Sequence, residues 1–190
     1  METKLHEGKV FESVNYSEKE LAKREFDQCE FIKCDFTKSN LSNNEFTDCT
    51  FKNCNFSLTR LNNTGLRNCK FINCKVLGVD FTVCKDFLFS VSFQASILDY
   101  SSFIQKKMKK TTFVDCSLKE VNFEQTDLSQ SVFTNCNLEN AIFRNSMLEK
   151  ADFLTSYNYS FDPELNKIKG AKFSQAGAIG LLAKYGIDIE

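Results

Sequence analysis

The chain has 190 residues, with 24 Lys and Arg, 25 Asp and Glu and a single His, for a formal net charge of −1 at pH 7. This balance disfavours bulk electrostatic binding to nucleic acid or to a membrane surface, and no apolar run approaches the roughly 18 residues of a membrane span. The N-terminus lacks the apolar core of a secretory signal, so we expect a single-domain cytoplasmic protein.

Nine cysteines are present, and their spacing argues against both a disulfide framework and a metal site. Three pairs with members five residues apart repeat every 20 residues, namely Cys29 and Cys34, Cys49 and Cys54, and Cys69 and Cys74. No CxxC motif occurs, and one histidine, His6, cannot build the common zinc sites. We therefore predict reduced thiols that pack as small apolar side chains, with no metal and no cofactor.

Phenylalanine recurs every 20 residues, with one break of two extra residues. The positions are Phe11, Phe31, Phe51, Phe71, Phe93, Phe113, Phe133, Phe153 and Phe173. Within this repeat a large apolar residue falls at every fifth position, and the residue two places before it is usually small. A period of five fits neither an α-helix nor a strand. It predicts a four-sided coil whose turns stack at about 4.8 Å, with the large and small residues inside.

Taken in chain order, residues 1–25 are predicted to form an N-terminal capping turn. Lys9, Val14, Lys19 and Arg24 occupy positions that hold small inward residues in later turns. Residues 26–173 are predicted to form the β-helix itself, with the phenylalanines from Phe31 to Phe173 as its structural core. Because each turn exposes polar backbone until a neighbour covers it, such arrays need caps.

Residues 82–87 hold the two-residue insertion and are predicted to be irregular. The resumed period makes Leu88 the inward residue, leaves Phe87 and Phe89 outward, and puts Cys84 outside the ladders of small residues. Further on, the run Lys106–Lys110 places Lys106 at a small inward position. We expect its long stem to carry the ammonium to solvent and to loosen that corner.

Near the C-terminus the period is interrupted over residues 158–167, around Phe161 and Pro163. Residues 174–190 are predicted to form a short α-helix and tail, with Ser174 as N-cap and Gly186 at the C′ position. This segment either plugs the end of the rod or also pairs with a second copy, since exposed apolar area needs covering in both cases. The candidate dimerisation residues are Ile179, Leu181, Leu182, Tyr185 and Ile187.

The sequence has no Gly-rich phosphate loop, nucleophile elbow or HExxH motif, so we predict no catalytic residues and no enzyme activity. Surface charge is segregated instead: residues 33–75 carry a net +4 and residues 115–154 a net −4. The second region offers a candidate acidic surface for a basic partner. Its residues are Asp115, Glu120, Glu124, Asp127, Glu139, Glu149 and Asp152. An outward apolar set forms a second candidate contact surface: Ile32, Ile72, Val114, Val132 and Leu154.

The repeat, seen for example in Cys29–Lys33 and Ala141–Asn145, resembles the pentapeptide repeat family. This resemblance implies an all-β fold, a right-handed quadrilateral parallel β-helix. Within the family, the stretch Cys74–Phe81 and the ending Gly180–Ile187 are similar to the Qnr and MfpA types of quinolone-resistance protein. That similarity implies a DNA-mimicking rod that dimerises through its C-terminal helix, binds DNA gyrase or topoisomerase IV, and protects the enzyme from quinolones.

The chain also departs from the Qnr type. It runs in regular repeats through Phe46–Phe56, where those proteins carry a first projecting loop, and has only the two-residue excess near the second. Two other functions are therefore considered: a general protein-interaction scaffold with an unidentified partner, and nucleic-acid binding through Lys106–Lys110. A continuous acidic face would favour mimicry, and an exposed apolar strip would favour the scaffold.

Overall fold

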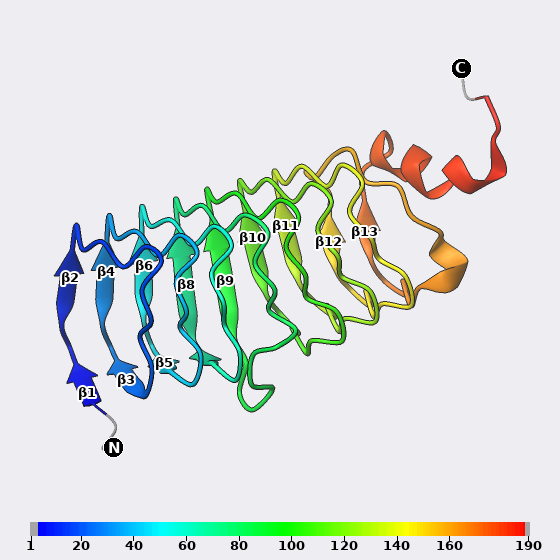
Figure 1. Cartoon of the computed structure of the whole chain (residues 1–190). Coiled ribbons are helices and arrows are strands. Elements are labelled where there is room, and N and C mark those ends of the chain that lie inside the picture. Colours follow the sequence, from blue (N-terminus) through cyan, green and yellow to red (C-terminus); the bar gives the residue numbers. More distant parts are fainter. Residues whose placement is uncertain (1–3, 189–190) are drawn as a thin grey trace.

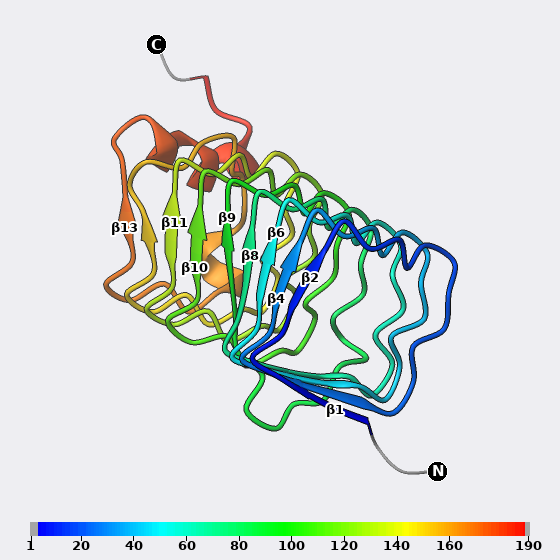
Figure 2. The same ribbon diagram turned by 90° about the vertical axis from the view of Figure 1, so that its left-hand side faces the viewer.

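Each turn of the chain lies directly over the turn before it, and the turns build a four-sided parallel β-solenoid of about eight turns. The computed structural model describes residues 4–188. The two ends of the chain lie at opposite ends of the rod (Figure 1), and Figure 2 shows the four-sided outline of the coils. The predicted fold class is confirmed for the solenoid.

Two adjacent sides of the rod contain the named strands, all of them parallel. The first sheet is formed by β1 (Lys4–Glu7), β3 (Arg24–Asp27), β5 (Glu45–Thr47) and β7 (Gly65–Arg67). The second sheet runs the whole length of the rod, through β2 (Val10–Glu12), β4 (Glu30–Ile32), β6 (Thr50–Lys52), β8 (Cys69–Ile72), β9 (Val91–Gln94), β10 (Thr112–Val114), β11 (Val132–Thr134), β12 (Asp152–Phe153) and β13 (Lys172–Phe173). The other sides pair through isolated parallel bridges, such as Asn40 with Arg60.

The register places the repeated phenylalanines in one column, as the sequence predicts. Phe113 pairs with Phe93 on one side and with Phe133 on the other. Their rings stack nearly parallel, with centroids 5.5 Å and 4.9 Å apart. Rings from adjacent columns meet edge to face, as Phe113 and Phe123 do at 5.8 Å. Stacked and edge-to-face rings are both favourable arrangements, so the columns hold one another together.

The small inward residues link successive turns by hydrogen bonds. Thr64 donates its hydroxyl to the carbonyl of Leu41 at 2.8 Å, and Ser146 donates to Phe123 at 2.7 Å. Buried thiols do the same more weakly, as Cys49 does toward the Phe26 carbonyl at 3.4 Å. In each case the donor lies one turn downstream of the acceptor. These side chains satisfy backbone carbonyls that point into the dry interior.

A residue with positive φ follows most of the large inward residues by two positions and turns the corner. Asparagine is common there, because its short polar side chain tolerates the left-handed region. Asparagines in successive turns bond to one another, as Asn63 does to Asn43 at 2.8 Å. The same corners also hold the bulkier Leu58 and Tyr100, with φ of 58° and 63°.

The insertion follows Cys84, whereas the sequence predicts it within residues 82–87. Two predictions, for Leu88 and Phe89 and for Cys84, are therefore wrong. Leu88 is 63% exposed, whereas Phe89 is only 8% exposed and is the inward ring of this turn. Cys84 is buried, so it continues the small-residue positions instead of lying outside them. The five-residue period therefore continues to Cys84, and the extra residues loop out directly after it. The period alone cannot locate the slip, because Leu88 and Phe89 are both large and apolar.

The predicted C-terminal α-helix is wrong. The segment forms two short 3₁₀ helices, η2 (Gly177–Leu181) and η3 (Ala183–Tyr185), after an earlier one, η1 (Pro163–Leu165). Ser174 Oγ does accept a hydrogen bond from the Gly177 amide at 3.0 Å, and Gly186 has φ 58° as a C-cap. A Cβ on Gly180 would lie 1.9 Å from the carbonyl oxygen of Tyr159. The segment is thus held against the last coil through glycines, which are poor α-helix formers.

Candidate interaction surfaces

The residues after Cys84 form a loop that leaves the regular outline of the rod (Figure 1). Lys106 fixes this loop from the turn above, and the prediction that its ammonium reaches solvent is wrong. Its side chain is 3% exposed, and its Nζ donates to the Cys84 carbonyl at 2.6 Å and to Asp86 at 2.7 Å. The ammonium also lies 5.3 Å from the centre of the Phe89 ring. Lys106 therefore tightens this corner, because it replaces a short inward hydroxyl by a tether to the loop.

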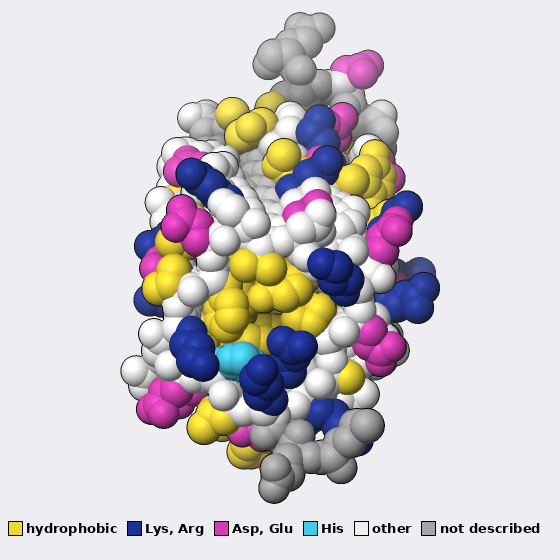
Figure 3. Space-filling model, turned by 60° about the vertical axis from the view of Figure 1, so that its left-hand side comes forward, with side chains coloured by type: hydrophobic (Ala, Val, Ile, Leu, Met, Phe, Trp, Pro, Cys, Tyr) yellow, Lys and Arg dark blue, Asp and Glu magenta, His cyan; other side chains and the backbone are white. Residues whose placement is uncertain are grey.

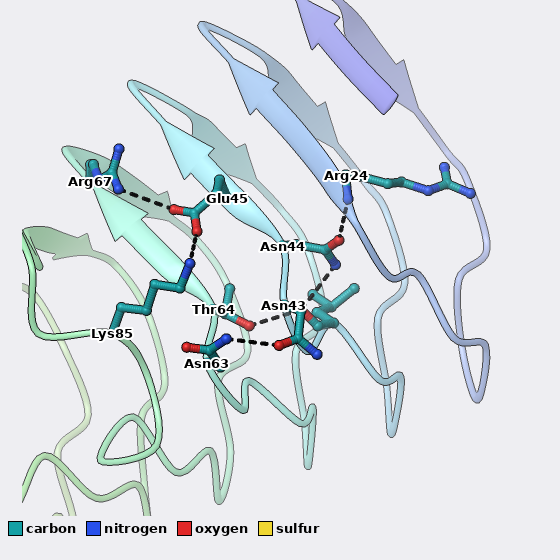
Figure 4. Close-up of polar contacts among 9 residues, drawn as sticks. Arg24, Asn43, Asn44, Glu45, Asn63, Thr64, Arg67 and Lys85 are labelled. Carbon is teal, nitrogen blue, oxygen red and sulfur yellow. Dashed lines mark hydrogen bonds and ion pairs between the residues drawn. The ribbon is translucent and has the colours of Figure 1, made fainter. Parts of the chain in front are cut away.

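A second ion pair holds the loop from the turns below. The Glu45 carboxylate reaches across Gly65 and bonds Lys85, which lies 40 residues further along the chain. It also lies 3.4 Å from the Arg67 guanidinium (Figure 4). A Cβ on Gly65 would lie 1.9 Å from the Glu45 carboxylate, so the absence of a side chain at Gly65 makes this contact possible.

Residues 84–89, which we call the clamped loop, display two large apolar side chains. Phe87 is 68% exposed and Leu88 63% exposed. The Arg67 guanidinium lies 5.4 Å from the centre of the Phe87 ring, which partly orients it. An apolar pair on a loop fixed by ion pairs is suited to contact with another protein.

A second apolar surface lies on the side of the rod that follows the phenylalanine column. Leu58, Gly78 and Tyr100 occupy the same corner in three successive turns, and Leu58 and Tyr100 are exposed. Ile97 is exposed on the same side, where it bridges Lys75 and Ser117. The sequence signal for this surface is the use of leucine and tyrosine at corners that elsewhere carry polar residues. We call it the corner patch.

The apolar set predicted from the sequence is not continuous. Along the long sheet Ile32 pairs with Lys52, which in turn pairs with Ile72. Further up, Gln94 separates Ile72 from Val114, and Thr134 pairs with Val114. Every second turn therefore places a polar side chain between the apolar ones.

The structure does not bring the seven predicted acidic residues together on one side. Asp115 and Asp152 belong to the side of the Phe113 column, and Glu120 and Glu139 follow or flank the next column, at Leu118 and Leu138. Glu124 lies beside Phe123 on the third side, and Asp127 and Glu149 flank the fourth column, at Leu128 and Leu148. Each side of the rod thus carries one or two of these carboxylates.

Three of these carboxylates are paired with lysines. Asp127 is buried and lies 3.3 Å from Lys109, Glu139 lies 2.8 Å from Lys119, and Asp152 lies 3.4 Å from Lys172. Asp115 accepts a hydrogen bond from Asn135 at 3.0 Å. Among the described residues, no ion pair is formed by Glu120, Glu124 or Glu149.

The run Lys106–Lys110 is divided by the fold. Lys106 is buried and Lys109 pairs with Asp127. Of the four lysines in this run, Lys107 and Lys110 are therefore the two that are exposed and form no ion pair with a described residue. Met108 points inward and is buried. The run is therefore no continuous cationic cluster for a phosphate backbone.

The candidate dimerisation residues are accessible, although they do not lie on an α-helix. Ile179, Leu182, Tyr185 and Ile187 are exposed and Leu181 is half-buried. The segment is tied to η1 because Lys184 lies 2.7 Å from Asp162 and 2.8 Å from Glu164. The hydrogen bond from Lys184 holds the pKa of the Asp162 carboxyl below its usual range.

A metal site, a membrane span and a reactive thiol each set structural requirements for the described residues. Within residues 4–188, no group of His, Cys, Asp and Glu is placed to hold a metal ion, and no helix is long and apolar enough to cross a membrane. The nine cysteines are free and buried. Burial raises the pKa of the Cys49 and Cys84 thiols to about 12, which keeps them protonated and unreactive.

Comparison with known proteins identifies a family and several solved structures of similar fold. The model described as "Pentapeptide repeat region" matches residues 24–87 and 79–153. Two trypsin-treated variants of QnrB1, a plasmid-mediated fluoroquinolone resistance protein, share the fold at TM-scores of 0.63 and 0.66. The first is 17% identical over 98% of this chain and 100% of that one, and the second is 19% identical over 100% and 92%. No curated protein matches the sequence.

Proposed function

Because the chain belongs to the pentapeptide repeat family, we propose that it is a non-enzymatic rod that binds another protein through its surface. The partner we propose is DNA gyrase or topoisomerase IV, with protection of that enzyme from quinolones as the consequence. Support comes from the shared fold with QnrB1 along the whole chain and from the Qnr-like stretches Cys74–Phe81 and Gly180–Ile187.

The clamped loop is the observation that carries this proposal. The sequence resemblance aligns it with the second projecting loop of the Qnr type, and in this chain it leaves Phe87 and Leu88 exposed to solvent. Fixing the loop through Lys106 and Glu45 reduces the conformational entropy lost when a partner binds. A partner would bury the two exposed side chains, and these are the contacts that typically dominate the binding energy of an interface.

A supercoiling assay tests the proposal. Purified protein is titrated into DNA gyrase with relaxed plasmid, with and without ciprofloxacin. We expect it to restore supercoiling in the presence of the drug, and we expect a Phe87→Ser, Leu88→Ser variant to lose the effect. The control is Ile32→Ser, Leu154→Ser, which removes two apolar side chains from the long sheet without touching the loop. If the wild-type protein changes neither supercoiling nor drug inhibition, the proposed partner is wrong.

DNA mimicry is the part of the proposal that depends on free carboxylates. Only Glu120, Glu124 and Glu149 of the candidate acidic surface lack a lysine or amide partner in the described structure, so they are the ones to change. If the rod imitates a DNA backbone, the triple Gln variant will bind gyrase more weakly than a variant in which the paired Glu139 alone is Gln. Equal binding by both would mean that contact is made through the apolar surfaces.

The corner patch favours the second candidate function, a scaffold for a different protein. Its members Leu58 and Tyr100 are exposed at the same corner of the rod. A photo-crosslinking residue placed at Tyr100 should capture the partner in cells, and the same residue at the exposed Lys70, on the side of the long sheet, serves as the control. Equal labelling from both positions would count against a specific site at the patch.

We also propose that the C-terminal segment pairs with a second copy through its exposed apolar side chains. Sedimentation velocity over a range of concentrations should give a dimer, and Leu182→Glu should give a monomer. Leu165→Glu, on η1, is the matched control, since Leu165 is also exposed. A wild-type monomer at all concentrations would leave the segment as an end plug alone.

A further inference from the structure

The N-terminal end of the rod differs from every later turn in the residues at its inward small positions. In later turns these residues donate upstream, as Thr59 does to the Phe36 carbonyl at 2.7 Å. In the first turn no described residue lies upstream, and the four equivalent positions carry Lys4, Lys9, Val14 and Lys19, while Arg24, which pairs with Lys4, begins the next turn. Three of the four short side chains are thus replaced by lysines in the turn at the N-terminal end of the described chain.

The aromatic side chains at this end are covered by described rings from one side only, and Phe11 and Tyr16 are half-buried. His6 stacks on Phe26 with centroids 4.9 Å apart, Phe11 stacks on Phe31 at 4.8 Å, and Tyr16 lies over Phe36 at 5.0 Å. In the described chain, no ring covers their other faces. Figure 3 shows the result, an apolar surface at the end of the rod that is surrounded by lysine and arginine side chains and contains the histidine.

His6 adds a second and independent observation. The residue is only 6% exposed, and neither ring nitrogen has a hydrogen-bond partner among the described residues. Burial, with smaller contributions from Lys9, Lys4 and Arg24, lowers the pKa of its imidazole and favours the neutral ring. Buried polar groups are normally satisfied, so the two ring nitrogens are unsatisfied polar atoms just beneath the surface of this end.

Within residues 4–188, the backbone at this end has no partner strand on its upstream edge. β1 and β2 are the terminal strands of their sheets. In the next turn Glu30 donates its amide to the Lys9 carbonyl at 2.9 Å, and Asp35 donates to Val14 at 3.0 Å. The residue that corresponds to Glu30 in the first turn is Val10, and no described carbonyl lies upstream of its amide. Its side chain is exposed as well.

We propose that the N-terminal end binds an extended, carboxylate-bearing segment of a partner protein, which stacks on the rod as one further turn. Only a polypeptide supplies the alternating amides and carbonyls that the edges of β1 and β2 can pair with. Its carboxylates would bond Lys9, Lys19 and Arg24, and its apolar side chains would cover His6 and Phe11. A second copy bound end to end through the same surface would oppose like charges, which excludes that arrangement.

This surface is independent of the sides of the rod and of the partner proposed for them. The four described carboxylates of the first turn do not close it, because all occupy outward positions and are exposed: Glu7, Glu12, Glu18 and Glu20. Lys19 does bond the Asn15 carbonyl at 2.7 Å, a contact that a carboxylate could replace. Lysines at a strand edge also discourage pairing with other strands of like charge, so the same residues select for an acidic segment.

The experiment measures binding of a fluorescein-labelled heptapeptide, Asp-Val-Glu-Phe-Asp-Thr-Glu with blocked ends, to the full chain by fluorescence anisotropy. Two peptide controls are used: one with every Asp and Glu changed to its amide, and one with N-methyl groups on alternate backbone amides. The protein variant is Lys9→Glu, Lys19→Glu. Its matched control is Lys70→Glu, Lys75→Glu, which makes the same change in net charge at two exposed positions in the middle of the rod.

We expect saturable binding that weakens at least tenfold with either control peptide and with the Lys9, Lys19 variant, and less than twofold with the Lys70, Lys75 variant. Equal weakening by both protein variants would overturn the proposal, because bulk charge would then explain the binding. Full affinity of the N-methylated peptide would overturn strand addition. Tighter binding of a single-stranded oligonucleotide, or concentration-dependent self-association abolished by Lys9→Glu, Lys19→Glu, would replace the proposed occupant by another.

Discussion

Replacing Phe113 by alanine should be among the most destabilising single changes in the rod. Its ring is fully buried and stacks on both sides, on Phe93 at 5.5 Å and on Phe133 at 4.9 Å, with Phe123 edge-on. Truncating a buried phenylalanine costs about 3–5 kcal/mol, and the upper half of that range applies because a rigid stack closes poorly over a cavity. We therefore expect a loss of about 4–5 kcal/mol in the free energy of unfolding.

The same substitution at the end of the same column provides the comparison. Phe11 is half-buried and stacks on one side only, on Phe31. Phe11 therefore contributes about half as much free energy of burial and ring stacking as Phe113, and Phe11→Ala should lower the free energy of unfolding by about 2 kcal/mol. In a solenoid each turn contacts only its neighbours, which makes an interior turn responsible for two interfaces and a terminal turn for one.

Urea unfolding followed by circular dichroism and by tyrosine fluorescence measures both variants, since the chain has five Tyr and no Trp. A Phe113→Leu variant keeps most of the volume and should lose only about 1–1.5 kcal/mol, which separates the cavity from loss of the ring. Equal losses for Phe11→Ala and Phe113→Ala, or a loss below about 2 kcal/mol for the latter, would refute the assignment of an interior ring held from both sides.

Three further predictions follow from single positions. His6→Phe should remove a pH dependence of stability. Burial lowers the folded-state pKa of His6, so the unfolded chain takes up a proton first as pH falls below about 6.5, and wild-type stability should decrease on acidification. Thermal melts from pH 8 to pH 5 should show this decrease for the wild type and not for the variant. Gly65→Ala should cost about 1 kcal/mol by displacing the Glu45 carboxylate from Lys85, and the cost should disappear in a Glu45→Ala background if the two positions are coupled as the structure places them. Leu58→Asn should raise stability by about 0.5–1 kcal/mol, since an exposed leucine at φ 58° is strained where asparagine is not; a lower midpoint in urea would contradict this.

The surfaces were harder to predict than the core. The acidic residues of 115–154 cluster in the sequence, yet successive five-residue repeats lie on successive sides of the rod, so the fold distributes these residues around it. The apolar set from Ile32 to Leu154 fails for a related reason, since its members alternate with Lys52, Gln94 and Thr134 in successive turns. The members of the corner patch at equivalent corners are 20–22 residues apart along the chain, so the patch can be recognised only when successive turns are aligned.

The clamped loop shows where periodicity stops being informative. The two-residue excess announces an insertion between Phe81 and Phe93, but Leu88 and Phe89 are equally suitable inward residues, and only packing against Phe81 and Lys106 selects Phe89. Lys106 is a similar case. A lysine at an inward position contradicts the repeat until the carbonyl of Cys84 and the carboxylate of Asp86 are found within reach.

The amino-acid sequence by itself determined the four-sided coil, its register and its aromatic columns, because a strict period leaves one way to bury every fifth residue. Tertiary structure alone decided where the insertion leaves the rod, that the C-terminal segment folds as 3₁₀ turns, and which charges are paired. These outcomes depend on contacts between turns 20 or more residues apart, such as Glu45 with Lys85 and Gly180 with Tyr159, for which no local pattern carries a signal.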